Sequence, residues 1–257
     1  ELEPWQLTFI SVGIPGFLVM FLILTVKEPA RVSTIVNDSL ERSSIGQTFA
    51  WARERWQLYL SVAVGVSGMA IAGYGQLIWY PEFLFRTYGV GKSEVGTSLG
   101  VIFIVAGTAG TFFGAGLASF LVKRGYQDAN LRTLMYSALL SLVPGSLAPL
   151  MGSPGHALFL IGLVVFFHYM HFGVTVAGLQ LVTPNRMRAQ YTAALLFVSN
   201  LFGLAMGGSI VAFLTDFVFG ADAALRYSLT CVAAISYTLV VFVILWGLPY
   251  YSTQSTR

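Results

Sequence analysis

The chain has 257 residues, of which 56% are hydrophobic and only 10% are charged, and its mean hydropathy is +0.75. So few charged groups do not cover the surface of a water-soluble protein of this length. The net charge of +3 comes without a basic patch interleaved with aromatic residues, so nucleic acid is not an expected partner. The composition instead predicts an integral membrane protein.

Apolar runs long enough to cross a bilayer recur along the chain. A helix needs about 20 mostly apolar residues to cross a hydrocarbon core of roughly 30 Å, because lipid offers no partner for unpaired backbone groups. The sequence predicts an all-α, polytopic membrane bundle of seven transmembrane helices, at about 5–26, 57–80, 95–122, 132–151, 156–182, 191–219 and 225–248.

The charged residues predict an orientation and four segments. With the N-terminus outside, eleven Lys and Arg residues fall inside and three outside, which is a clear positive-inside asymmetry. We therefore expect a cytoplasmic C-terminus. The expected segments are the first span (1–26), a cytoplasmic linker (27–56), a six-helix bundle (57–248) and a cytoplasmic tail (249–257). Because the chain does not begin with Met, we interpret it as a fragment or a processed product.

The linker contains one pattern typical of a short surface helix. Ser44 and Gln47 have the spacing of a capping box, in which each side chain bonds the other residue's backbone N–H. An apolar face follows, made of Ile45, Phe49, Ala52 and Trp56. Such a helix lies along a membrane surface. The alternative is a flexible tether.

Glycine spacing predicts close contacts between helices. Small residues four positions apart let helices approach each other in lipid, where no hydrophobic driving force brings them together. Three pairs have this spacing, namely Gly96 and Gly100, Gly110 and Gly114, and Gly203 and Gly207. We interpret them as packing contacts rather than gating elements.

The stretch "SLGVIFIVAGTAGTFFGAGLASFLVKRG", residues 98–125, resembles the second span and following loop of a major facilitator half. The signature of that loop is Gly-x-Leu-Ala-Asp-x-Leu-x-x-Arg-Gly. The matching residues are Gly116, Leu117, Ala118, Leu121, Arg124 and Gly125. Ser119 stands where the family has an acidic residue, which puts the charged part of the family's cytoplasmic latch in doubt.

Three further stretches extend this resemblance over the chain. Residues 79–89, 179–208 and 13–31 resemble the seventh span, the junction of spans ten and eleven, and the sixth span. Together they are most similar to the bacterial spinster-like branch of the superfamily, in its second half, spans 6 to 12. The resemblance implies a bacterial inner membrane and a missing amino-terminal half. Arg186 and Arg188 lie in the short basic turn between spans, where we expect a topology anchor.

Two histidines, His168 and His171, lie near the middle of the predicted span 156–182, three positions apart and so on one helical face. Ionisable groups at this depth usually face a water-filled cavity or a partner. We expect both rings to line a substrate cavity near the membrane midplane. The alternative is that each imidazole only bonds a neighbouring helix. No metal or other cofactor is expected, since no suitable third ligand lies at this depth.

Other polar residues at comparable depth are expected on the same cavity, namely Tyr74, Gln76, Tyr169 and Asn200. Asn200 is the strongest of them, because a neutral amide in hydrocarbon needs a hydrogen-bond partner. For three hydroxyls we prefer a packing role in which each bonds its own helix, namely Thr108, Thr111 and Ser199.

The resemblance implies secondary active transport by alternating access, with a small amphipathic, lipid-like or organic-anion substrate. Proton coupling is compatible with it, although the coupling carboxylates and arginines of this family generally belong to the amino-terminal half. The predicted spans two to seven contain no acidic residue before Asp216. We do not expect an enzyme. The alternatives are a membrane-embedded enzyme with paired histidines, an inactive truncated transporter, and a heptahelical receptor, whose Asp-Arg-Tyr and Asn-Pro-x-x-Tyr motifs are absent from this sequence.

Overall fold

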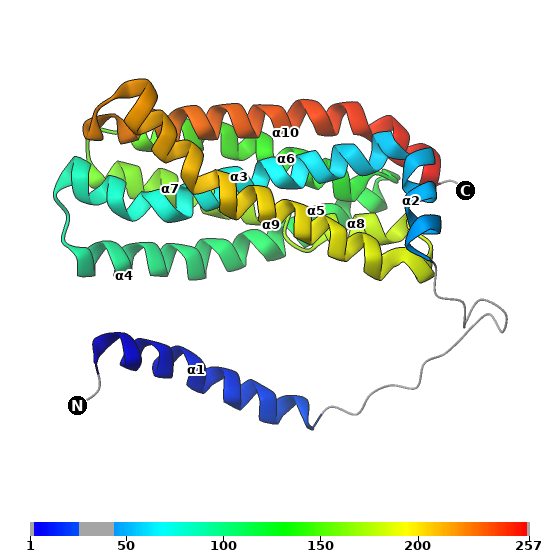
Figure 1. Cartoon of the computed structure of the whole chain (residues 1–257), viewed down its shortest axis with the longest axis horizontal. Helices are drawn as coiled ribbons and strands as arrows, with labels where there is room; N and C mark the ends of the chain where they lie inside the picture. Colours follow the sequence, from blue (N-terminus) through cyan, green and yellow to red (C-terminus); the bar gives the residue numbers. More distant parts are fainter. Residues whose placement is uncertain (1–2, 26–43, 256–257) are drawn as a thin grey trace. The chain divides into compact units, whose positions relative to one another are not determined.

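The computed structural model describes residues 3–25 and 44–255 and divides into two units, 1–41 and 42–257 (Figure 1). The first unit holds helix α1 (Pro4–Ile23), which follows a capping box between Glu3 and Gln6. Most of the expected linker, residues 26–43, lies outside the described residues.

The second unit is a bundle of helices that run beside one another (Figure 1). Its helices are α2 (Ile45–Glu54), α3 (Trp56–Tyr88), α4 (Lys92–Ile102), α5 (Thr108–Lys123), α6 (Ala129–Leu147), α7 (Pro154–Tyr169), α8 (Val174–Leu181), α9 (Arg188–Phe213) and α10 (Leu225–Ser255). Short π-helical segments, η1 (Phe103–Gly107) and η4 (Leu214–Phe219), join α4 to α5 and extend α9. The described part of the chain contains no strand, so the predicted all-α fold class is confirmed.

Six helical stretches of the described residues are long and apolar enough to cross a membrane. They are Trp56–Tyr88, Lys92–Lys123, Ala129–Leu150, Pro154–Leu181, Asn185–Phe219 and Asp222–Tyr251. The predicted number of membrane-spanning helices, seven, is therefore corrected to six of this length in the described part of the chain. The first predicted span falls short because the apolar part of α1 covers only Phe9–Ile23. At 1.5 Å per residue that part rises about 22 Å, which is less than a hydrocarbon core of roughly 30 Å.

Helix α3 lies at the centre of the packing, against α9 on one side and α10 on another. Helix α10 also packs on α6, and α6 packs on α7. The contact of α3 with α9 depends on two glycines, because a Cβ on Gly75 would lie 3.0 Å from the carbonyl oxygen of Gly207. Side chains at these positions would separate the two helices.

The predicted glycine contacts are present at two of the three pairs. A Cβ on Gly110 or Gly114 of α5 would overlap the main chain of α7 and the turn after it. The pair in α9, Gly203 and Gly207, likewise lies directly against α3. The predicted close contact at Gly96 and Gly100 is wrong, because a Cβ at either position would meet nothing within 4 Å. Spacing alone did not identify which face of that helix has a neighbour.

The short helix predicted after Ser44 is also present. Its capping box is formed, with 3.2 Å from the Gln47 N–H to Ser44 Oγ and 3.0 Å from the Ser44 N–H to Gln47 Oε1. Thr48 is buried and hydrogen-bonds to the first turn of α9, whereas Ile45 and Phe49 are largely exposed. A helix held by a polar contact, with its apolar side chains exposed, is suited to a membrane surface. The alternative of a flexible tether is wrong for α2.

The packing of α5 can be tested at Gly114, where an added Cβ would overlap the carbonyl oxygen of Met170. Because a carbonyl oxygen of the main chain cannot rotate away as a side chain can, we expect Gly114→Ala to lower the free energy of unfolding by about 1–3 kcal/mol. The measurement is equilibrium unfolding in mixed micelles, followed by circular dichroism. The control is Gly116→Ala in the same helix, where a Cβ would meet nothing within 4 Å. Equal stability of the two variants would contradict the close approach.

Candidate functional site

The fifth predicted span, 156–182, is not one continuous helix. Helix α7 ends at Tyr169 and α8 begins at Val174, with a turn between them. Gly173 has φ +82°, a conformation that residues with a side chain rarely adopt. This is a correction to the sequence analysis. The break falls between the two histidines, so His168 lies in the last turn of α7 and His171 lies in the turn that follows it.

Hydrogen bonds from side chains satisfy the carbonyl groups that the break exposes. The Ser137 hydroxyl of α6 lies 2.6 Å from the carbonyl oxygen of Phe167 and 3.1 Å from that of His168. The Nδ1 of His171 also bonds the His168 carbonyl, at 2.5 Å, and the Thr175 hydroxyl donates to the His171 carbonyl at 3.1 Å. Irregular backbone at membrane depth is stable only where protein or a cavity satisfies it. The turn is therefore a fixed part of the fold.

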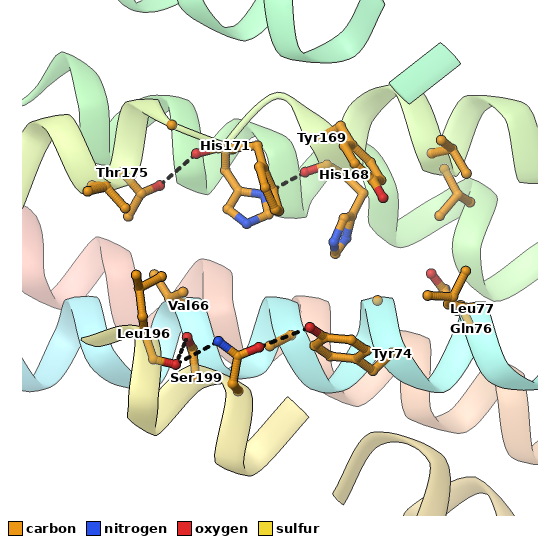
Figure 2. Close-up of a pocket in the computed structure, with 18 of the residues that line it drawn as sticks. Val66, Tyr74, Gln76, Leu77, His168, Tyr169, His171, Thr175, Leu196 and Ser199 are labelled. Atoms are coloured by element: carbon orange, nitrogen blue, oxygen red, sulfur yellow. Dashed lines mark hydrogen bonds between the residues drawn. The ribbon is translucent and has the colours of Figure 1, made fainter. Parts of the chain in front are cut away.

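A cavity of about 350 Å³ lies beside this turn, between α7 and α8 on one side and α3 and α9 on the other (Figure 2). The structure brings together around it all six residues that the sequence analysis placed on a cavity, namely Tyr74, Gln76, His168, Tyr169, His171 and Asn200. Both imidazole rings project from their main chain toward α3 and α9 (Figure 2). That these residues bind a substrate stays a prediction.

His168 belongs to a buried chain of hydrogen bonds. Its Nδ1 lies 3.2 Å from the hydroxyl of Tyr237 in α10, and that hydroxyl donates to Gln76 Oε1 of α3 at 3.1 Å. All three side chains are at least nine-tenths buried. The alternative weighed for the histidines, a bond to a neighbouring helix, therefore holds for His168 together with a place on the cavity wall.

A second network lies on the side of the cavity that α9 forms. The Tyr74 hydroxyl donates to Asn200 Oδ1 at 3.0 Å, and Asn200 Nδ2 donates to the carbonyl of Leu196 at 2.8 Å. The amide thus has the partners that its depth requires. Ser199 bonds the same carbonyl within its own helix, as expected, yet it also lines the cavity. The Thr111 hydroxyl bonds its own helix, and Thr108 is exposed away from the cavity.

Several cavity residues escaped the sequence analysis. They are mostly apolar or aromatic, among them Val66, Leu77, Tyr80, Phe103, Phe172 and Leu196. Such residues are indistinguishable from lipid-facing ones in a membrane sequence, so periodicity gave no signal for them. Tyr237 was detectable, because a hydroxyl in the middle of a predicted span needs a partner just as an amide does.

The proteins to which this chain is similar are described as transporters. No family model matches the chain. An MFS-type efflux pump of Mycolicibacterium smegmatis is 26% identical over 234 residues, which cover 90% of this chain and 53% of that protein. Two crystal structures of a bacterial homologue of the human lysosomal transporter Spinster, both inward-facing, match the whole chain. The unoccupied one has a TM-score of 0.62 and the occupied one 0.57, each at 22% identity.

The chain has the fold of the matched 60% of the unoccupied Spinster homologue, which is a part of the major facilitator fold. The spinster-like resemblance is confirmed at the level of the fold, and the protein is a multi-pass membrane protein. The chain spans about half of the curated relative, and the two Spinster homologues are matched over 60% and 58% of their length.

The residues matched to the major facilitator loop lie away from the cavity, at the end of α5. Gly125 has φ +88°, and its N–H donates to the carbonyl of Val122 while the next N–H reaches Leu121, which ends the helix in a left-handed cap. Arg124 stacks on the ring of its own helix's Phe120 at 4.8 Å.

Ser119 shows no latch contact among the described residues. Its hydroxyl donates to the carbonyl of Ala115 in its own helix at 2.9 Å. Gly116, earlier in the motif, is open on the helix surface. In the second basic turn, Arg188 donates to the carbonyl of Thr183 at 3.0 Å, and Arg186 lies in the short helix before it. A conformational role for these residues stays a prediction.

The hydrogen-bond chain behind the cavity can be tested at Tyr237. The substitution Tyr237→Phe leaves His168 Nδ1 and Gln76 Oε1 without their shared partner, which we expect to cost about 1–3 kcal/mol of unfolding free energy. The control is Tyr227→Phe, at an exposed tyrosine of the same helix, with an expected change of no more than about 0.5 kcal/mol. Unfolding in mixed micelles measures both. Equal effects of the two substitutions would show that this chain of hydrogen bonds contributes nothing to stability.

Proposed function

We propose that the protein is the carboxyl-terminal bundle, spans 6 to 12, of a secondary active transporter that works by alternating access. The observation that carries the proposal is the convergence of polar side chains from α3, α7, α9 and the turn after α7 on one cavity between these helices. Substrate sites of transporters with this kind of fold lie near the membrane midplane, between two bundles. The broken helix beside the cavity is a further feature of such sites.

The similar proteins support transport rather than catalysis. The mycobacterial relative is described as an efflux pump, and the solved structures are homologues of a lysosomal transporter in unoccupied and occupied states. The described residues contain no group of three or more His, Cys, Asp or Glu arranged to hold a metal ion. The candidate site offers a few hydrogen-bonding groups on a largely apolar wall.

We assign a small amphipathic or lipid-like molecule as substrate. The cavity wall combines aromatic rings with a few hydrogen-bonding groups, which is the composition of most sites for small organic ligands. An organic anion is the second class within this proposal. Its charge has to be met by the other half of the transporter, because no Asp, Glu, Lys or Arg lines this cavity in the described residues.

The proposal includes a place in the membrane and a partner. With α1 counted as a short seventh span, the excess of Lys and Arg on one side favours an N-terminus outside and a C-terminus in the cytoplasm of a bacterial inner membrane. Alternating access requires two bundles that rock about a shared site. An amino-terminal bundle of five further spans completes the transporter, and any coupling to protons uses carboxylates of that bundle.

Transport by the 257-residue chain alone is the direct test. Because rocking requires two bundles, liposomes that contain only this chain are expected to show no protein-dependent movement of either of two probes, fluorescent lysophosphatidylcholine or radiolabelled gluconate. Dithionite quenching measures the first probe and filtration the second. Empty liposomes are the control.

The partner half has a test of its own. Coding DNA upstream of Glu1 is expected to encode five further apolar spans, and joining them to this chain is expected to produce probe movement above the level of empty liposomes. Movement with the chain alone, or a start codon close to Glu1, would overturn the two-bundle proposal.

A further inference from the structure

The hydrogen bonds around the cavity define which groups remain free to meet a ligand. The first group is His171. Its Nδ1 lies 2.5 Å from the His168 carbonyl oxygen, and a carbonyl oxygen only accepts hydrogen bonds. Nδ1 therefore carries the proton of the neutral ring, and Nε2 presents a lone pair. Among the described residues no partner contacts this Nε2, and Figure 2 shows the ring projecting into the cavity.

The second group is His168, whose proton is assigned through the buried chain. Tyr237 uses its one proton to donate to Gln76 Oε1, so its oxygen accepts from His168. The proton of this imidazole is therefore also on Nδ1, and Nε2 is again an acceptor. The ring edge that holds Nε2 faces Gly73 of α3, where a Cβ would lie 2.8 Å away. Because Gly73 has no side chain, this edge fits closely against α3, and the described residues give Nε2 no hydrogen-bond partner.

Three hydroxyls of the wall have already used their protons. Tyr74 donates to Asn200, Thr175 donates to the His171 carbonyl, and Ser199 donates to a carbonyl of its own helix. Two buried donors at the wall lack a partner within the described part of the chain, Gln76 Nε2 and the Tyr80 hydroxyl. The two imidazoles, with ring centres 5.2 Å apart, are thus a pair of adjacent free acceptors.

We propose that the cavity binds an uncharged amphipathic molecule through hydroxyl or N–H donors, which give hydrogen bonds to Nε2 of His168 and Nε2 of His171. An apolar body of the ligand contacts the aromatic wall of Tyr169 and Phe172. A charged group is disfavoured here, because the described lining contains no ionised partner for it and burial of an unpaired charge is costly. This inference rests on the proposed function, since it assumes that the cavity is a ligand site.

Four naphthalene probes separate these features of the ligand. They are naphthalene-2,3-diol with two donors, 2-naphthol with one, 2-methoxynaphthalene with none, and 2-naphthoate with a charge and no donor. Binding to the 257-residue chain in nanodiscs is measured by titration calorimetry, with empty nanodiscs as the blank for partition into lipid. We expect 2-naphthol to bind about tenfold more tightly than the methyl ether, the diol more tightly still, and the naphthoate most weakly.

Substitutions at each histidine test whether the preference for ligands with hydrogen-bond donors depends on its Nε2. His168→Asn and His171→Asn keep an amide near Nδ1 but place no acceptor at Nε2, so each is expected to reduce the advantage of the diol over the methyl ether about tenfold. His168→Gln and His171→Gln bring an amide oxygen close to the position of Nε2 and are expected to recover part of that advantage. The control is His156→Asn, at the exposed start of α7, which is expected to change nothing. Thermal unfolding of each variant verifies that it is folded.

The outcomes distinguish this inference from the proposed function. Loss of donor preference in the asparagine variants, with recovery in the glutamine variants, supports the inference. Equal binding of naphthol and methyl ether, or the same loss in His156→Asn, overturns it and leaves the cavity as a ligand site. If none of the four probes binds above the empty nanodisc, the inference fails, whereas the proposed function is decided separately by probe movement in liposomes that contain the joined chain.

Discussion

The arrangement of the site depends on one constraint, which is that backbone polar groups inside a membrane need partners within the protein. A continuous helix meets this need by itself, but the turn between α7 and α8 does not. The Ser137 hydroxyl and the His171 ring supply the bonds that the helix loses there. Because that ring is held by its Nδ1, the same contact that stabilises the turn also directs Nε2 toward the cavity.

Glycines, which have no side chain, shape the rest of the site. Glycines of α5 let that helix contact the main chain around the turn, and Gly73 of α3 leaves space for the edge of the His168 ring. Gly75 and Gly207 bring α3 against α9, so that Tyr74 reaches Asn200 across the contact. In lipid, where hydrophobic burial does not draw helices together, such close packing and interhelical hydrogen bonds provide much of the association energy. The packing and the site are therefore the same set of contacts.

The cavity is unlike the charged sites of many ion-coupled transporters. It joins neutral imidazoles, an amide and hydroxyls to an aromatic wall, and within the described residues no ionised side chain lines it. In the proposed transporter, this half contributes shape and hydrogen bonds. Under the proposed function, charge recognition and proton coupling belong to the opposite bundle, and the predicted spans before Asp216 contain no acidic residue.

The sequence determined the membrane class, six of the expected spans, the helix after Ser44 and the place of both histidines within one span, because these follow from composition and local spacing. Tertiary structure alone decided that the span of the histidines is broken, that Gly96 and Gly100 contact nothing while Gly110 and Gly114 contact main chain, and that Tyr237 links His168 to Gln76. Each of these depends on which helix lies opposite, and neither periodicity nor glycine spacing contains that information.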